Sequence, residues 1–277
     1  MKPAPFAYHA AETVEDAIAA LAELGDEASV LAGGQSLLPL LNLRLARPSA
    51  LVDVGRIAAL SGIDANGALQ LGATTRQADA LRSRLVAERA PLLSEALRHA
   101  GHPATRSRGT VGGSIAHADP AAELPAVLLA LDGEAIVLSA TGERAIPASS
   151  LFLGPFTTAL AEGELLTALR LPDPPAGARH GFAEIARRHG DFALAGAAVV
   201  VAPGYARVAL FGVAPAAFRA EDAERALVQG TGAEEVARLA AAAAEPSADP
   251  HATAAYRMEA ARVATLRALL ATGLAHG

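Results

Sequence analysis

Two short segments of the sequence join paired glycines to small polar residues, a combination that can hold phosphate groups. Residues 33–36 read Gly-Gly-Gln-Ser, and residues 110–114 read Thr-Val-Gly-Gly-Ser. Because glycine has no Cβ, a ligand can lie on the backbone and accept hydrogen bonds from its N–H groups. Such bonds to a charged phosphate contribute about 1.5–3 kcal/mol each. Taken alone, each segment is more typical of a tight turn, but the two together favour one ligand with two phosphates.

Other side chains that often do chemistry lack the partners they need in this sequence. His117 and Asp119 stand two residues apart, which gives no common helical face, and no second histidine lies at ligand spacing, so no metal site is predicted. Ser36 and Ser114 lack the histidine and acid that would activate a nucleophile. The chain has no cysteine, which excludes thiolate metal sites and iron–sulfur clusters held by this chain. No catalytic residue is predicted.

The composition is that of a globular chain with a large core. Of its 277 residues, 52% are hydrophobic and 19% are charged, which argues against disorder. The net charge of −6 and the lack of a basic tract argue against a nucleic-acid partner. No apolar run reaches the roughly 18 residues of a membrane span, and no export signal is visible. The expected location is the cytoplasm, without membrane insertion.

Strands and helices are expected to position both glycine segments. A buried strand over residues 28–32 leads into the first segment, and a helix over residues 37–45 follows it. The second segment is expected to close a loop over residues 106–114, ahead of a helix that starts near Pro120, where the missing N–H of proline costs nothing. The order of strand, paired glycines and helix is typical of phosphate binding, although the sequence matches neither the P-loop nor G-x-G-x-x-G.

A proline-rich stretch divides the chain into two parts. Residues 172–177, Pro-Asp-Pro-Pro-Ala-Gly, give the strongest linker signal, so a domain boundary is predicted at residue 176. Three short strands after the linker predict an antiparallel meander. Three predicted helices follow these strands, over residues 220–229, 233–244 and 253–271. Strands followed by helices indicate an α+β order.

Four blocks of the sequence resemble one known family. They read A-G-G-Q-S-L-L-P at 32–39, G-H-P-A-T-R-S-R-G-T-V-G-G-S-I-A-H-A-D-P-A-A-E-L-P at 101–125, A-R-R-H-G-D-F-A at 186–193 and A-A-Y-R at 254–257. In this order they resemble the FAD-binding medium subunit of the molybdenum hydroxylases, the family of xanthine dehydrogenase and aerobic carbon monoxide dehydrogenase. The block at 101–125 is the most specific.

The resemblance implies a fold of class α+β. Residues 1–176 would be an FAD-binding domain of the vanillyl-alcohol-oxidase (PCMH) type, with subdomains at roughly 1–56 and 57–176. Residues 177–277 would be a small domain with a three-stranded antiparallel sheet and a helical bundle.

The resemblance also implies which residues hold the cofactor, FAD. The diphosphate and ribityl chain would lie on the two glycine segments, Glu123 would contact the cofactor where relatives usually have Asp, and Leu166 would border the flavin ring through its backbone. Relatives often carry Lys near positions 183–184, where this chain has Ala183 and Glu184. The complete predicted set is Val30, Leu31, Ala32, Gly33, Gly34, Gln35, Ser36, Leu37, Thr110, Val111, Gly112, Gly113, Ser114, Glu123 and Leu166.

The implied role is electron transfer within a complex. In the family, a large subunit with a molybdopterin cofactor hydroxylates the substrate, and a small subunit with two [2Fe–2S] clusters passes the electrons to FAD on the medium subunit, in a dimer of heterotrimers. FAD then delivers them to an acceptor such as NAD, a quinone or oxygen. Two alternatives stay open: a freestanding flavin oxidoreductase on the same fold, and a scaffold subunit without flavin. Neither the substrate nor the acceptor is readable from the sequence.

Overall fold

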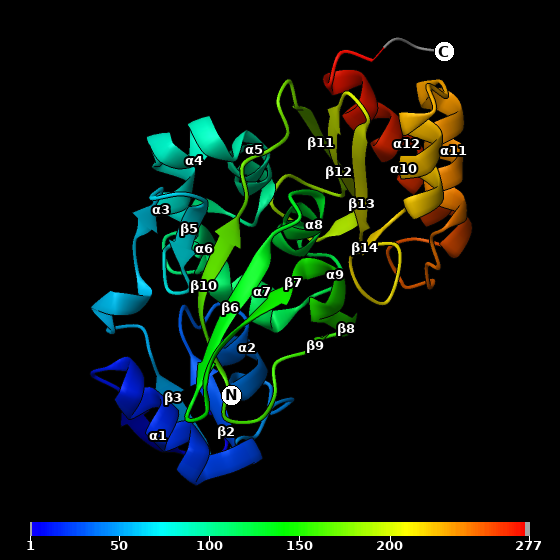
Figure 1. Ribbon diagram of the computed structural model, residues 1–277. Coiled ribbons are helices and arrows are strands. Elements are labelled where there is room, and N and C mark those ends of the chain that lie inside the picture. The colour runs from blue at the N-terminus through cyan, green and yellow to red at the C-terminus, as the bar shows by residue number, and fades with distance from the viewer. Residues whose placement is uncertain (1, 275–277) are drawn as a thin grey trace.

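The computed structural model describes residues 2–274, and three sheets with their helices follow one another along this part of the chain (Figure 1). The first sheet is parallel, in the order β1-β3-β2. Its strands are β1 (Ala7–Ala10), β2 (Ala28–Leu31) and β3 (Ala50–Asp53). The helical turns of this part are α1 (Val14–Leu24), η1 (Gly25–Glu27), α2 (Leu37–Asn42) and η2 (Ala58–Leu60).

Local sequence signals explain α1. The Thr13 hydroxyl accepts the N–H of Asp16 at 3.1 Å, and Gly25 ends the helix with a φ of 61°. Between these caps, Ala17, Ile18 and Leu21 are buried against the sheet, as their helical spacing predicts. The strand expected at 28–32 forms as β2, but its residues are only partly buried or exposed because it is an edge of the sheet.

The second sheet is antiparallel and has five strands in the order β4-β5-β10-β6-β7. These strands are β4 (Ile63–Asp64), β5 (Leu69–Gly72), β10 (Leu165–Leu171), β6 (Glu134–Ser139) and β7 (Gly142–Pro147). The accompanying helices are α3 (Gln77–Arg82), α4 (Arg84–Arg89), α5 (Pro91–His99), α6 (Pro103–Arg106), α7 (Val111–His117), α8 (Glu123–Ala130) and α9 (Ala148–Leu151). A small hairpin joins β8 (Phe152–Gly154) and β9 (Thr157–Thr158).

The third sheet is antiparallel and has four strands instead of the three expected. They are β11 (Arg179–Ala186), β12 (Ala193–Ala202), β13 (Tyr205–Phe211) and β14 (Phe218–Arg219). β14 is two residues long and pairs with Ala209 and Leu210, so it is too short to show a two-residue periodicity in the sequence. The three predicted helices form as α10 (Glu221–Val228), α11 (Ala233–Ala242) and α12 (Ala254–Ala271).

Both faces of the third sheet are buried. Ala198 and Val200 of β12 belong to the core that contains residues of α5 and α8, whereas Ala197 and Val199 belong to the core with α11 and α12. This alternation follows the two-residue period of a strand. Residues 172–178 contain no helix or strand. The core with α5 and α8 nevertheless includes residues from both sides of this stretch, so the two parts of the chain share one hydrophobic core.

Candidate cofactor site

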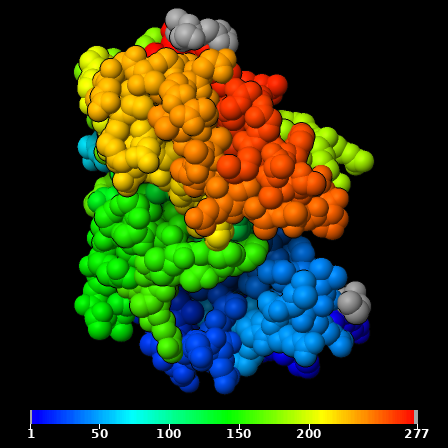
Figure 2. Space-filling model, turned by 90° about the vertical axis from the view of Figure 1, so that its right-hand side faces the viewer, coloured from blue at the N-terminus to red at the C-terminus, as the bar shows by residue number. Residues whose placement is uncertain are grey.

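A cavity of about 1250 Å³ is lined by residues from the regions of the first, second and third sheets. Its walls come from the first glycine segment, from α7 and the start of α8, and from residues 187–194 and 245–257 of the C-terminal part. Figure 2 shows the C-terminal residues (orange) above the N-terminal residues (blue), with a hollow where they face each other.

The two glycine segments lie side by side on one wall of this cavity. A Cβ added to Gly33 would collide with the carbonyl oxygen of Arg108 and would lie 2.9 Å from the Cα of Gly109. Only glycine at position 33 therefore allows the first turn to pack against the backbone that leads into the second segment. Both segments also line the same cavity, so that both face the same space.

The first segment supplies unused N–H donors. Gly34 has a φ of 71°, which favours glycine, and its carbonyl accepts the N–H of Leu38 at the start of α2. Within residues 2–274, the backbone N–H groups of residues 34–37 donate no hydrogen bond, although these residues line the cavity. These four donors are available to an anionic group in the cavity.

The second glycine segment was expected to be part of a loop. In the structure it forms the N-cap and the first turn of α7. Thr110 caps this helix, its hydroxyl accepting the N–H of Gly113 at 3.0 Å. The N–H groups of Val111 and Gly112 donate to the carbonyls of Thr75 and Ala73 at 3.0 and 2.9 Å. These three N–H groups are already used within the protein, so they are not available as donors to a ligand. A Cβ added to Gly112 would lie 2.6 Å from the Cβ of Ala73, so this glycine lets α7 pack closely on the residues that follow β5.

Most of the predicted site residues line the cavity. These are Val30, Ala32, Gly33, Gly34, Gln35, Ser36, Leu37, Thr110, Gly112, Gly113, Ser114, Glu123 and Leu166. Leu31 and Val111 are not part of the lining. Leu31 alternates with Val30 and Ala32 along its strand, and Val111 is buried in the core. Residue type alone did not separate these two from their neighbours.

A β-bulge brings the backbone of β10 to the cavity. The pairing of β10 with β6 shifts between Leu166 and Ala168, so Thr167 is the extra residue. The Thr167 carbonyl accepts the N–H of Ala73 at 2.8 Å, and Leu166 lines the cavity. Bulges of this kind locally end regular pairing and are common beside functional sites.

Glu123 is a buried acid in the cavity wall. It is the first residue of α8, which starts here and not near Pro120, because the Asp119 carboxylate accepts the N–H of Ala121 in a preceding turn. Its side chain is 8% exposed. The pKa of Glu123 is raised to about 7, mainly by burial. A hydrogen bond from its own backbone N–H opposes this rise, the charge of Asp119 adds to it, and the charge of Arg106 opposes it.

The far side of the cavity is formed by residues that were not predicted as site residues from the sequence. The side chain of Arg257 on α12 donates to the carbonyls of Leu194 and Gly212 at 2.8 and 2.9 Å, and it pairs with Asp249 at 2.6 Å. Phe192, which is 72% exposed, also lines this side. The blocks at 186–193 and 254–257 were the available signal, but only tertiary packing shows that they face the glycine segments.

Residues 2–274 contain no group of three or more histidine, aspartate or glutamate side chains that could hold a metal ion. None of the helices in this range is long and apolar enough to span a bilayer.

Comparison with known proteins identifies the family. The model of the FAD-binding domain in molybdopterin dehydrogenase matches residues 4–174, and the model of the CO dehydrogenase flavoprotein C-terminal domain matches residues 180–272. The chain belongs to the FAD-binding medium subunits of the molybdenum hydroxylases. This confirms the resemblance seen in the sequence, and FAD is the cofactor of such a domain.

Relatives of this medium subunit cover nearly its whole length. The 6-hydroxypseudooxynicotine dehydrogenase complex subunit alpha of Paenarthrobacter nicotinovorans is 42% identical over 97% of this chain and 95% of its own. The carbon monoxide dehydrogenase medium chain of Hydrogenophaga pseudoflava is 38% identical over 97% of both chains. These names describe subunits of larger enzymes, so they favour neither the freestanding flavin enzyme nor the scaffold without flavin.

Solved structures of relatives share the mixed helix and sheet fold of this medium subunit. A carbon monoxide dehydrogenase from Hydrogenophaga pseudoflava superposes with a TM-score of 0.95 at 40% identity, over 99% of both chains. Quinoline 2-oxidoreductase from Pseudomonas putida 86 gives a TM-score of 0.91 at 37% identity, again over 99% of both chains. The protein is an oxidoreductase subunit by this family membership.

Proposed function

We propose that this chain holds FAD in the cavity that its glycine segments line and passes electrons from an iron–sulfur partner to an external acceptor. The observation that carries the proposal is the pairing of the two segments on one wall, with four unused N–H donors on residues 34–37. When bound, FAD accepts electrons and delivers them in pairs. The chain itself supplies binding, orientation and electrostatic surroundings.

The residues present fit the diphosphate of FAD. The N–H groups of residues 34–37 would donate to the phosphate oxygens, and Gly113 would leave room for them beside the hydroxyl of Ser114. Gly33 holds the two segments together, as its close packing on Arg108 and Gly109 requires. Leu166 would border the flavin ring through its backbone, next to the bulge, and Glu123 would face the cofactor from α8. The whole predicted set, including Leu31 and Val111 behind the wall, would support this cofactor site.

The finer organisation also belongs to this proposal. The FAD-binding part would be of the PCMH type over residues 1–176, with subdomains at roughly 1–56 and 57–176, and residues 177–277 would form the C-terminal domain. The match of two separate family models to 4–174 and 180–272 supports this division. The chain would assemble with a molybdenum subunit and a [2Fe–2S] subunit into a dimer of heterotrimers in the cytoplasm.

Replacement of Gly34 by alanine tests the diphosphate site. Gly34 and Gly204 have the same φ of 71°, but Gly34 lines the cavity and Gly204 lies in the turn between β12 and β13 with no atom near an added Cβ. Both substitutions should cost about 1–2 kcal/mol of stability from backbone strain, because L-residues are strained at this φ. Gly34→Ala should cost somewhat more than Gly204→Ala, because its added Cβ would lie 2.9 Å from the Cδ1 atom of Leu38. Gly34→Ala should also weaken FAD binding about tenfold or more, since it displaces the following N–H donors.

The measurement is titration of the flavin-free full chain with FAD, followed by flavin fluorescence and by thermal unfolding. At a ligand concentration about 100-fold above Kd, FAD should add about 2.7 kcal/mol to the stability of the wild type and of Gly204→Ala. If the wild type bound no FAD, the proposed function would fail. If Gly34→Ala bound FAD as tightly as Gly204→Ala, the placement of the diphosphate would be wrong.

A further inference from the structure

Two buried polar side chains in the cavity wall have no hydrogen-bond partner in the protein. Gln77 is 8% exposed and Thr74 is 5% exposed, and both residues line the cavity. Within residues 2–274, neither the amide of Gln77 nor the hydroxyl of Thr74 makes a hydrogen bond, and neither group is sealed from solvent. Since these residues are otherwise buried, their free polar groups open onto the cavity.

The backbone holds Gln77 firmly beside the second glycine segment. Residues 73–77 lie antiparallel to residues 109–112 and are joined to them by backbone hydrogen bonds. In one of these bonds, the N–H of Gln77 donates to the carbonyl of Gly109 at 2.9 Å. Gln77 is also the first residue of α3. Its side chain therefore starts from a fixed point in the cavity wall.

The amide of Gln77 lies against Gly109, which in turn packs on the first glycine segment. A Cβ added to Gly109 would lie 3.0 Å from the Oε1 atom of Gln77, so glycine at this position leaves room for the amide. A Cβ added to Gly33 would lie 2.9 Å from the Cα of the same Gly109. The amide is thus a near neighbour of the segment whose N–H groups are proposed to bind the diphosphate.

The fold itself gains nothing from an amide at position 77. A buried polar group without a fixed partner is less stabilising than an apolar side chain of the same shape. The hydrogen-bond partner of this amide is therefore expected outside the chain, in the cavity.

We propose that the Gln77 amide binds a hydroxyl group of the carbohydrate chain next to the diphosphate of FAD, with the Thr74 hydroxyl as a second contact. This inference rests on the proposed function. The diphosphate of FAD is bonded on one side to the ribityl chain and on the other to a ribose, and the two ring systems lie farther away. An amide both donates and accepts hydrogen bonds, as a hydroxyl does, and it has no charge that would favour a phosphate.

Replacement of Gln77 by methionine tests this contact, because methionine has a similar length and cannot form the amide's hydrogen bonds. Titration of the flavin-free full chain with FAD should show that Gln77→Met binds about tenfold more weakly than the wild type. Gln70 on β5 is exposed and does not line the cavity. Gln70→Met should therefore bind FAD like the wild type.

Thermal unfolding without FAD separates this role from a structural one. Because the substitution removes a buried polar group that has no partner, Gln77→Met should unfold at the wild-type temperature or up to about 4 °C above it. A variant that loses affinity without losing stability supports a contact with the cofactor. A lower unfolding temperature would show that Gln77 supports the fold, and would overturn the inference.

Analogues of FAD that each lack one hydroxyl, on the ribityl chain or on the ribose of the adenosine, identify the group bound. The wild type should bind at least one analogue about tenfold more weakly than FAD, and Gln77→Met should bind that analogue and FAD alike. The position of the missing hydroxyl then tells which of the two chains is contacted.

Two results would overturn this contact and leave the proposed function intact. One is a Gln77→Met variant that binds FAD as tightly as the wild type, and the other is a variant that discriminates among all the analogues as the wild type does. A wild-type chain that bound no FAD would overturn both the contact and the proposed function.

Discussion

At the residue scale, the buried acid Glu123 and the half-buried acid Glu184 make the stability of the chain depend on pH. Their folded-state pKa values, about 7 for Glu123 and about 8 for Glu184, lie above the ordinary value of 4.5. Between 4.5 and these values, the folded chain binds more protons than the unfolded chain. Its free energy of unfolding therefore decreases as pH rises, and the stabilisation present below about pH 4.5 is lost by about pH 8.

Urea unfolding of the flavin-free chain at a series of pH values measures this loss. Each pKa unit corresponds to about 1.4 kcal/mol for a fully desolvated group, and solvent access to Glu184 reduces its share. Glu184→Gln should make the chain more stable than the wild type at pH 8 and should flatten the decline above pH 6. If Glu184→Gln were as pH-dependent as the wild type, Glu184 would be ionised in the folded chain at neutral pH.

At the scale of elements, one N-cap fixes the first turn of α7 in the cavity wall. The hydroxyl of Thr110 is the hydrogen-bond acceptor for the N–H of Gly113, and a Cβ added to Gly113 would lie 2.6 Å from that hydroxyl. Thr13 caps α1 in the same way, with its hydroxyl 3.1 Å from the Asp16 nitrogen. The two threonines therefore form a matched pair, one at the cavity and one away from it.

Thr110→Ala and Thr13→Ala should lower stability to a similar degree, about 0.5–2 kcal/mol each, as is usual for a lost N-cap. Thr110→Ala should in addition weaken FAD binding, because the first turn of α7 then shifts in the cavity wall. Chemical unfolding and FAD titration of both variants check this expectation. Equal FAD affinities would show that the cap serves stability alone.

The element scale also shows where sequence reasoning succeeded and where it did not. The helix α1 was predictable because Thr13 and Gly25 mark its ends and its apolar spacing marks its face. The helix α7 was missed because paired glycines disfavour a helix, and its first N–H groups find partners on Ala73 and Thr75, far away in sequence. Tertiary contacts of this kind leave no local pattern.

The candidate site, too, was predictable from the sequence only in part. The glycine segments were recognisable from residue type. Which of them offers N–H donors was decided by hydrogen bonds to Ala73 and Thr75, which follow β5, and to the hydroxyl of Thr110. The third sheet packs on α8 and places residues 187–194 in the cavity wall, and no spacing in the sequence predicts this docking.

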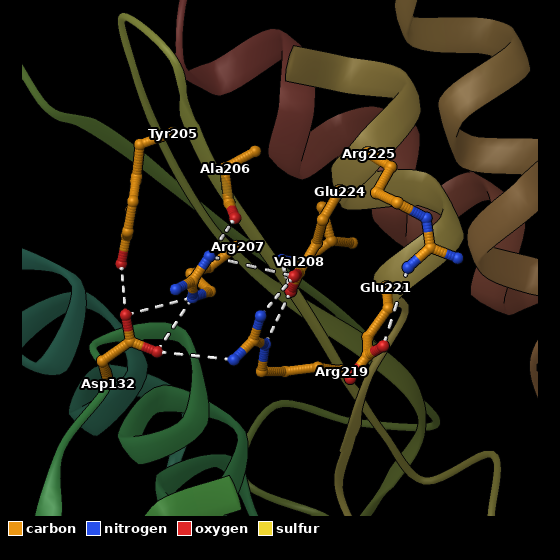
Figure 3. A network of polar contacts seen from close by, with 9 residues as sticks. All are labelled: Asp132, Tyr205, Ala206, Arg207, Val208, Arg219, Glu221, Glu224 and Arg225. Carbon is orange, nitrogen blue, oxygen red and sulfur yellow. Dashed lines mark hydrogen bonds and ion pairs between the residues drawn. The ribbon is translucent and has the colours of Figure 1, made fainter. Parts of the chain in front are cut away.

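At the scale of the whole molecule, a network of ion pairs fastens the third sheet to the rest of the chain (Figure 3). Asp132, which follows α8, accepts hydrogen bonds from Tyr205 and Arg207 at 2.8 Å. Glu224 on α10 accepts the backbone N–H of Val208 at 3.0 Å and pairs with Arg219 at 2.5 Å. The side chain of Glu224 is largely buried, so its charge depends on these partners.

Glu224→Ala should lower the free energy of unfolding by about 3–5 kcal/mol, because it leaves the Arg219 charge without its main partner. The neighbouring Glu221, which is exposed on the same helix, provides the control. Glu221→Ala should change stability by less than about 1 kcal/mol. Urea unfolding of both variants decides between a structural network and a set of dispensable surface contacts.

The position of Arg257 has a consequence for the order of events during synthesis. Arg257 lines the cavity from α12, the last helix of the chain, and holds Leu194 and Gly212 in place through their carbonyls. The glycine segments leave the ribosome more than a hundred residues earlier, into a pocket that still lacks one side. In the order of synthesis, the cavity is therefore enclosed only after α12 has been made and has packed in place.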